Sequence, residues 1–335
     1  MTVSPATLLD LAQTRVWSND SALPGYEATT LPLAPDDDGP LCATLVRRHR
    51  TETTRRAVLY VHGFVDYFFQ THVADAFAKA GWDFYALDLR RYGRSLRGGN
   101  RPNYTTNLSH YDEELSLAID IVRREEEHDT LVLLGHSTGG LITSWYMHRG
   151  ALRNDVQGLV LNSPFFDFAI PASRRIKLKV ATLLGAIIPS ASDPKAVSRW
   201  YGDSLLKEHH GEWTYDLRWK PLLGFPAYFG WVRAVRKVQV RLAKGLSIAS
   251  PVLLLHAGSS LLAEDEWKDA YLANDIVLDV EHMKGRGPGI GRDVTLQNFP
   301  DGVHDLFLSR RSVRDDVLHS TLTWLESRFG VAANV

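Results

Sequence analysis

Short apolar runs recur along the chain and are separated by longer segments with helical periodicity. The runs cover residues 57–64, 83–90, 130–137, 156–163, 251–258 and 293–299. They are rich in Val, Leu and Tyr, and several are apolar throughout, which is typical of parallel strands buried on both faces. Helical patterns fill residues 68–80, 108–127 and 138–149. The alternation predicts an α/β fold with a mostly parallel, doubly wound sheet that has helices on both faces.

The alternation stops after residue 168 and resumes at residue 251. The stretch between has no clear strand run and is rich in Trp, Tyr and Phe. We therefore predict three parts: 1–167 as the first part of the α/β core, 168–248 as a helical cap insertion, and 249–335 as the second part of the core. Near the N-terminus, Asp-Asp-Asp-Gly at 36–39 separates two β-like runs and predicts a hairpin.

Composition narrows the classes of protein and of partner. The chain has 335 residues, of which 44% are hydrophobic and 23% charged, so it is neither fibrous nor mostly disordered. The chain has 38 basic and 39 acidic residues, so its formal net charge is −1. This balance does not favour a nucleic acid partner. The one cysteine, Cys42, cannot form an internal disulfide. The N-terminus has no basic region before a long apolar stretch, so we expect a cytoplasmic protein. The sequence leaves the oligomeric state open.

The string GHSTGG at 135–140 carries the strongest chemical signal. It fits Gly-x-Ser-x-Gly, and it stands between an apolar run and a helical pattern. A strand, a sharp turn and a helix expose a serine hydroxyl above a parallel sheet. A simple turn between any strand and any helix is the alternative interpretation, but the flanking segments favour the first. We therefore predict that Ser137 is a nucleophile.

A serine nucleophile needs a base and an oxyanion site. His304 lies in DGVHD, after the last strand-like run, where the base comes last in a serine, acid, histidine order. We therefore predict His304 as the base, rather than a histidine in a polar surface turn. The backbone N–H of Thr138, directly after the nucleophile, is one expected oxyanion donor. The N–H of Phe64, in the HGF segment after an apolar run, is the other.

Several motifs together resemble one protein family. LYVHGF, LDLRRYGRS, LLGHSTGG, LVLNSPFFD, PVLLLH and DGVHD are similar to segments of the α/β-hydrolase superfamily. The resemblance is to the branch of monoacylglycerol lipases, lysophospholipases and the serine aminopeptidases S33. It implies an α/β-hydrolase fold and an esterase or lipase that needs no cofactor. No metal site stands out either, because the chain has no paired cysteines and no helical pair of histidines at ligand spacing.

The acidic member of the predicted triad is the least direct assignment. In the resemblance, the aspartate follows PVLLLH by a few residues, but the simplest register puts Ser260 there. A second register matches DIVLDVE and makes Asp275 the acid, after an inserted segment. Asp167, Asp265 and Asp279 stay open as alternatives. The acid must accept a hydrogen bond from the base, so geometry decides among them.

The aromatic insertion suits a substrate with an acyl chain, although these rings are also suited to fill a core within the insertion. The basic and apolar segment at 174–188 is expected to be a helix packed on the body, with transient contact to a membrane or lipid surface as the alternative. We expect a hydrolase of carboxylic esters of the monoacylglycerol or lysophospholipid type. A peptidase, a lactonase, an acyltransferase, and a non-catalytic ligand-binding protein of the same fold are the alternatives.

Overall fold

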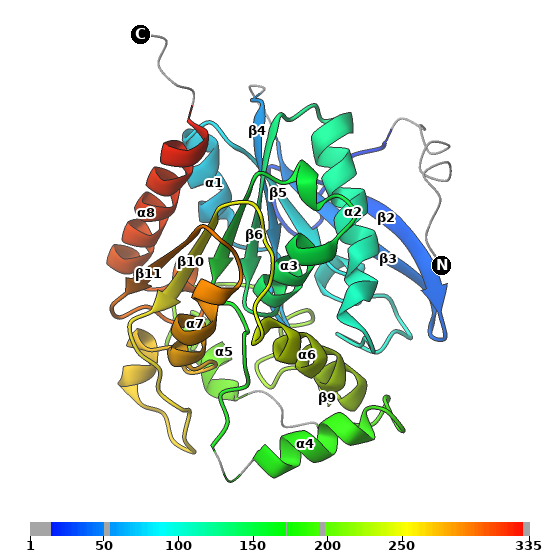
Figure 1. Ribbon diagram of the computed structural model, residues 1–335, viewed down its shortest axis with the longest axis vertical. Coiled ribbons are helices and arrows are strands. Elements are labelled where there is room, and N and C mark those ends of the chain that lie inside the picture. Colours follow the sequence, from blue (N-terminus) through cyan, green and yellow to red (C-terminus); the bar gives the residue numbers. More distant parts are fainter. Residues whose placement is uncertain (1–14, 50–53, 172, 174, 194–197, 331–335) are drawn as a thin grey trace.

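A mixed β-sheet forms the centre of the structure, a computed structural model that describes residues 15–49, 54–171, 173, 175–193 and 198–330 (Figure 1). Within these residues the sheet has nine strands in the order β1-β2-β3-β5-β4-β6-β7-β10-β11. Their bounds are β1 Ser18–Asn19, β2 Tyr26–Asp36, β3 Gly39–Arg48, β4 Arg56–Val61, β5 Asp83–Asp88, β6 Thr130–His136, β7 Gly158–Asn162, β10 Val252–Ala257 and β11 Val294–Phe299. The strands from β5 to β11 in this order pair in parallel, and β1, β2 and β3 are antiparallel. The prediction of a mostly parallel sheet is confirmed.

Helices cover both faces of this sheet, as the sequence predicts. Helices α1 (Thr71–Lys79) and α8 (Arg311–Phe329) pack on one face, and α2 (Asp112–Asp120), α3 (Thr138–Arg149) and α6 (Phe229–Leu242) on the other. Side chains of a strand alternate between the faces, so a parallel strand covered by helices on both faces carries runs of consecutive apolar residues. In β6, Leu131 and Leu133 face α2 and α3, whereas Val132 and Leu134 face α1 and α8.

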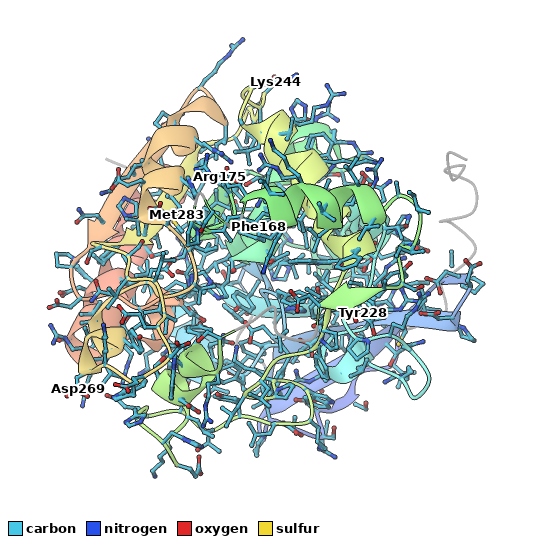
Figure 2. All side chains as sticks on the ribbon, turned by 90° about the horizontal axis from the view of Figure 1, so that it is seen from below. Phe168, Arg175, Tyr228, Lys244, Asp269 and Met283 are labelled. Atoms are coloured by element: carbon cyan, nitrogen blue, oxygen red, sulfur yellow. The ribbon has the colours of Figure 1, made fainter. Side chains whose placement is uncertain are left out.

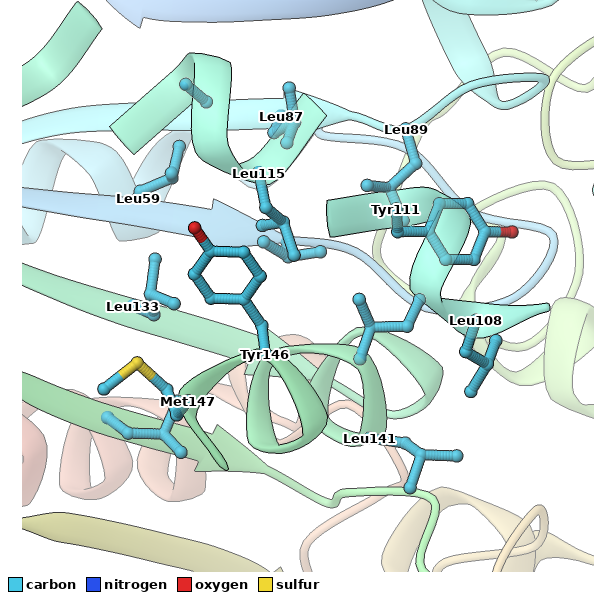
Figure 3. Close-up of a cluster of buried hydrophobic side chains, with 14 of the residues drawn as sticks. Leu59, Leu87, Leu89, Leu108, Tyr111, Leu115, Leu133, Leu141, Tyr146 and Met147 are labelled. Atoms are coloured by element: carbon cyan, nitrogen blue, oxygen red, sulfur yellow. The ribbon is translucent and has the colours of Figure 1, made fainter. Parts of the chain in front are cut away.

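The larger core cluster lies between the sheet and helices α2 and α3 (Figure 3). Leu59 and Leu133 from the strands meet Leu115 of α2 and Tyr146 of α3, and all four side chains are fully buried. Burying one leucine stabilises a fold by about 2 kcal/mol. The cluster fixes α3 against β6, and the turn that joins them carries Ser137.

Other predicted elements are present with small differences. The hairpin at 36–39 joins β2 to β3, with Asp36 opposite Gly39. The helical pattern at 108–127 consists of a 3₁₀ turn at Leu108–Tyr111, helix α2, and a π-helical turn at Ile121–Glu125. A 3₁₀ turn is common at the end of a helix, whereas a π-helical turn is rare and is not predictable from the apolar pattern.

The chain between β7 and β10 holds helices α4 (Arg175–Leu184), α5 (Arg199–Leu205) and α6, and a strand pair, β8 (Ser192–Asp193) with β9 (Ala227–Tyr228). Two-residue strands leave no periodic pattern in a sequence, which is why they were not predicted. Figure 1 shows this insertion at the edge where the parallel strands end. Helix α4 packs on α6, and α6 on α3. The proposed boundaries at 168 and 248 stay predictions. No described helix has both the length and the apolar composition that crossing a bilayer requires.

Candidate active site

Ser137 lies in a strained turn between β6 and α3. Its φ of +52° and ψ of −117° are unusual for a residue with a side chain. The turn is tight because a β-carbon on Gly139 would lie 2.3 Å from the carbonyl oxygen of Val61, and one on Gly135 would lie 2.4 Å from Thr143 Oγ1. The two glycines therefore let α3 start directly against β4 and β6. This geometry holds Ser137 at the carboxyl edge of the sheet.

Two buried side chains form a chain of hydrogen bonds with Ser137. His304 Nε2 lies 2.9 Å from Ser137 Oγ, and His304 Nδ1 lies 2.9 Å from Asp275 Oδ2. The exposed fractions are 7% for Ser137, 2% for His304 and 0% for Asp275. Because a carboxylate only accepts, Nδ1–H donates to Asp275 and Nε2 is left to accept from the Ser137 hydroxyl. The structure thus brings together the three residues predicted as nucleophile, base and acid.

Asp275 is held in place by the chain around it. Its Oδ1 accepts hydrogen bonds from the N–H groups of Val277 and Leu278, at 2.9 and 2.8 Å. Its backbone pairs across Ser260: the Asp275 N–H donates to the Ser259 carbonyl, and the Leu261 N–H donates to the Asp275 carbonyl. The segment between Leu261 and Asp275 therefore leaves the core and returns beside Ser260. Asp275 reaches the position where the simplest register of the family motif puts Ser260.

The other candidate acids lie in different surroundings. Asp167 forms ion pairs with Arg236 and Arg286. Asp265 is exposed on the segment before Asp275. Asp279 caps the N-terminus of α7 (Val280–Arg286), where its Oδ1 accepts from the Glu281 N–H.

The two predicted oxyanion donors are the backbone N–H groups of Phe64, in the segment after β4, and of Thr138, next to Ser137 in the sequence. A β-carbon on Gly63 would lie 3.1 Å from Ser137 Cβ, so the chain after β4 passes close to the serine. The next N–H, of Phe64, donates to no other backbone group in the described residues. The N–H of Thr138 is the first of α3 and so has no acceptor within its own helix. The assignment of these two N–H groups as oxyanion donors stays a prediction.

A second polar network behind His304 was missed by sequence reasoning. The buried carboxylate of Asp305 accepts from Asn162 Nδ2 at 2.7 Å and from Gln70 Nε2 at 3.1 Å. Asn162 in turn accepts from the Leu306 N–H at 3.2 Å. These hydrogen bonds attach the loop that contains His304 to the end of β7. The one signal in the sequence is Asn162 itself, a polar residue that ends an apolar strand.

A second histidine ring lies beside His304. The ring centroids of His136 and His304 are 5.0 Å apart. Burial lowers the pKa of His136 and so favours its neutral form.

A buried ion pair joins the insertion to the segment after β4. Lys220 Nζ lies 2.8 Å from Asp66 Oδ1, and the two side chains are 8% and 2% exposed. Burial raises the pKa of the Asp66 carboxyl, but the groups around it, the Lys220 ammonium first among them, together lower the pKa below its usual value. Tyr201 lies close to both Lys220 and His304. Its ring centroid is 5.5 Å from Lys220 Nζ and 5.4 Å from the centroid of the His304 ring. Sequence reasoning missed this pair, because nothing local relates residue 220 to residue 66.

We expect Lys220→Met to destabilise the fold by about 3–5 kcal/mol, because it leaves a buried carboxylate without its counter-charge. The double variant Asp66→Asn/Lys220→Met should recover much of the loss. Urea unfolding at pH 7 measures both. The depressed pKa of Asp66 gives the wild type stability above the unfolded carboxyl pKa, and this stability is lost as pH falls through the folded pKa. The difference between wild type and Lys220→Met should therefore shrink on acidification, and a constant difference would contradict this account.

Among the described residues, no group of three or more His, Cys, Asp or Glu side chains is placed to hold a metal ion.

Comparison with known proteins places the chain in a family. A family model described as serine aminopeptidase, S33 (Hydrolase_4) matches residues 52–308. A monoacylglycerol lipase of Mycolicibacterium smegmatis is 31% identical over 172 residues, which cover 47% of this chain and 58% of that protein. The chain thus matches little more than half the length of this relative.

Solved structures share the fold at low identity. A soluble variant of monoglyceride lipase from Saccharomyces cerevisiae aligns with a TM-score of 0.63 and 18% identity over 95% of this chain and 97% of that one. A carboxyl esterase from Bacillus coagulans aligns with a TM-score of 0.66 and 15% identity over 90% of this chain and 98% of that one. A monoacylglycerol lipase from Paleococcus ferrophilus aligns with a TM-score of 0.59 and 20% identity over 82% of this chain and 96% of that one. These likenesses confirm the predicted α/β-hydrolase fold. Because the family model spans most of the chain, as the motifs indicated, the protein belongs to the serine aminopeptidase S33 family of hydrolases.

Proposed function

We propose that the chain is a serine ester hydrolase that cleaves carboxylic esters with an apolar acyl group. The observation that carries the proposal is the buried chain of hydrogen bonds from Asp275 through His304 to Ser137, with both contacts at 2.9 Å. A serine hydroxyl is a weak nucleophile at neutral pH, and a positioned base activates it. Family membership and the lipases and esterases among the similar proteins support the same reaction class.

The first half of the reaction forms an acyl-enzyme. Ser137 Oγ attacks the carbonyl carbon of the ester while His304 Nε2 takes its proton. Asp275 holds the ring in the required tautomer and stabilises the imidazolium. The carbonyl oxygen becomes an oxyanion and accepts hydrogen bonds from the N–H groups of Phe64 and Thr138. His304 then gives the proton to the leaving alcohol as the bond from carbon to the alcohol oxygen breaks.

The second half returns the enzyme to its starting state. A water molecule takes the place of the alcohol and gives a proton to His304 Nε2 as it attacks the acyl carbon. The same two N–H groups, of Phe64 and Thr138, bind the second oxyanion. The bond to Ser137 Oγ breaks, His304 returns the proton to the serine, and the carboxylic acid leaves.

Aromatic rings next to Ser137 support an apolar acyl group. The rings of Phe64 and Trp231 are 4.2 Å apart, and Trp231 stacks on Phe165 at 6.3 Å. The Phe165 N–H donates to the Ser137 carbonyl, so this cluster begins at the nucleophile itself. Other aromatic residues of the insertion pack against the chain after β4, among them Trp213, Tyr215 and Trp219.

One polar group beside His304 supports a hydroxyl-bearing alcohol. The Tyr201 hydroxyl is buried and has no hydrogen-bond partner in the described residues, and its ring lies against His304. A buried hydroxyl without a partner costs about 1–3 kcal/mol, which a hydroxyl group of the substrate would offset. A glycerol ester, as in a monoacylglycerol or lysophospholipid, combines this polar end with an apolar chain.

The surface of α4 supports a further part of the proposal, a transient contact with a lipid surface. Ile176, Leu183 and Ile187, on α4 and just after it, are 71%, 65% and 78% exposed. Lys177 and Lys179 lie on the same helix. Exposed apolar residues flanked by lysines favour binding at the interface of an anionic membrane.

A panel of esters tests the reaction class. We expect hydrolysis of nitrophenyl esters from two to sixteen carbons, with an optimum at longer acyl chains, and hydrolysis of monoacylglycerol and lysophospholipid. An aminoacyl nitroanilide, a lactone, and an ester supplied with an acceptor alcohol test the peptidase, lactonase and acyltransferase alternatives. A faster reaction with one of these substrates would replace the ester assignment. No turnover of any substrate, together with binding of a fatty acyl ligand, would favour the non-catalytic binding protein.

A further inference from the structure

A cavity of about 770 Å³ lies between α4, α6, α7 and the segment after β7. Phe168 and Arg175, both labelled in Figure 2, belong to its wall. Its lining residues are Asp167, Phe168, Ile170, Arg175, Leu178, Lys179, Thr182, Leu183, Arg236, His282 and Arg286. This lining includes none of the residues that we assign to the triad or the oxyanion site. The lining of this cavity is therefore separate from the residues of the proposed active site.

The charge of this cavity is strongly positive. Four of its lining residues are lysine or arginine, whereas Asp167 is the one carboxylate. Asp167 is shared by Arg236 at 2.5 Å and by Arg286. Arg175 and Lys179 are exposed, and neither has an ion-pair partner in the part of the chain that the structure describes. Two cations thus remain without a counter-charge, and they come from the same face of α4, four residues apart.

The rest of the lining combines an apolar wall with an unsatisfied polar atom. Phe168, Ile170, Leu178 and Leu183 give the cavity an apolar side. His282 Nδ1 is buried and has no hydrogen-bond partner among the described residues. Buried polar atoms in folded proteins are usually hydrogen-bonded, so this nitrogen indicates a missing partner.

We propose that this cavity binds a single-chain amphiphile with an anionic headgroup, either a carboxylate or a phosphate. Guanidinium and ammonium groups form charge-assisted hydrogen bonds with both headgroups, and Arg175 and Lys179 are free to do so. The chain of the ligand lies against Phe168 and the leucines, as in other ligand sites that join an apolar wall to a few polar groups. The proposal does not depend on the reaction at Ser137, because binding needs no turnover.

The test is a calorimetric titration of the full chain with dodecanoate, followed by dodecyl phosphate, dodecanol and dodecyltrimethylammonium. We expect one dodecanoate per chain, with binding that weakens as salt is added. Dodecanol and the cationic amphiphile should bind at least about tenfold more weakly, since they lose or oppose the charged contacts. The ratio of dodecanoate to dodecyl phosphate affinity then identifies which headgroup the site prefers.

Variants of α4 locate the binding. Arg175→Gln/Lys179→Gln should weaken dodecanoate binding by about tenfold or more, and Lys179→Glu should weaken it further. Lys237→Gln is the matched control, because Lys237 is an exposed lysine of the neighbouring helix α6 that does not line the cavity, and it should bind as the wild type does. Equal affinity for dodecanoate and dodecanol would overturn the proposal. Equal losses in Lys237→Gln and the double variant would overturn it too, as would no loss in the double variant.

Discussion

Replacing Ser137 with alanine should lower kcat/KM for ester hydrolysis by about 10⁵- to 10⁶-fold, since it removes the atom that attacks the carbonyl. The Ser137 hydroxyl is the group that lies 2.9 Å from His304 Nε2. Steady-state kinetics with a nitrophenyl ester measure the loss. Circular dichroism and thermal unfolding check that the variant folds.

Ser163→Ala is a matched control for this variant. Ser163 is also buried, has a positive φ of 46°, and follows the neighbouring strand β7. Its hydroxyl has no hydrogen-bond partner among the described residues, so its loss should change kcat/KM by no more than a few-fold. Similar losses in the two variants would mean that the effect is structural and that Ser137 is not the nucleophile.

Replacing Asp275 with asparagine should lower kcat by about 10⁴-fold with little change in folding. The amide oxygen keeps the acceptor that binds the N–H groups of Val277 and Leu278. The amide nitrogen, in contrast, donates toward His304 Nδ1 and favours the tautomer whose Nε2 carries the hydrogen. That tautomer cannot accept the Ser137 proton. Comparing kcat and Tm of the variant with those of the wild type separates the two effects.

Asp279→Asn is the control for the acid, because Asp279 lies on the same segment and caps α7 without contact to His304. It should keep kcat within a few-fold of the wild type and lose about 1 kcal/mol of stability at most. If Asp279→Asn lost activity and Asp275→Asn did not, the assignment of the acid would be wrong.

Much of this fold follows from the sequence because the core strands are buried on both faces. In β6 and β10 the residues at 131–134 and 252–255 are all apolar, and such a continuous apolar run indicates a strand that is buried on both faces. The turn at Ser137 is equally readable, because only small residues fit where Gly135 and Gly139 touch neighbouring backbone and side chains. Local sequence therefore determines β6, the turn and α3.

What the sequence did not predict depends on contacts between distant segments. The backbone hydrogen bonds of Asp275 with Ser259 and Leu261 close a long loop, and no local sequence pattern indicates where such a loop returns to the core. The family motif matches Asp275 only in the second register, which places an inserted segment before it. The ion pair of Asp66 with Lys220 likewise joins two segments that only the packing of the insertion brings together.

The central claim is that His304 and Asp275 activate Ser137 for covalent catalysis. Reaction of the full chain with an alkyl fluorophosphonate, followed by digestion and mass spectrometry, tests it most directly. The account predicts a phosphonyl adduct on Ser137, formed much more slowly in Asp275→Asn and at the wild-type rate in Asp279→Asn. An adduct on another residue, or no adduct on Ser137 in the folded wild-type protein, would contradict it.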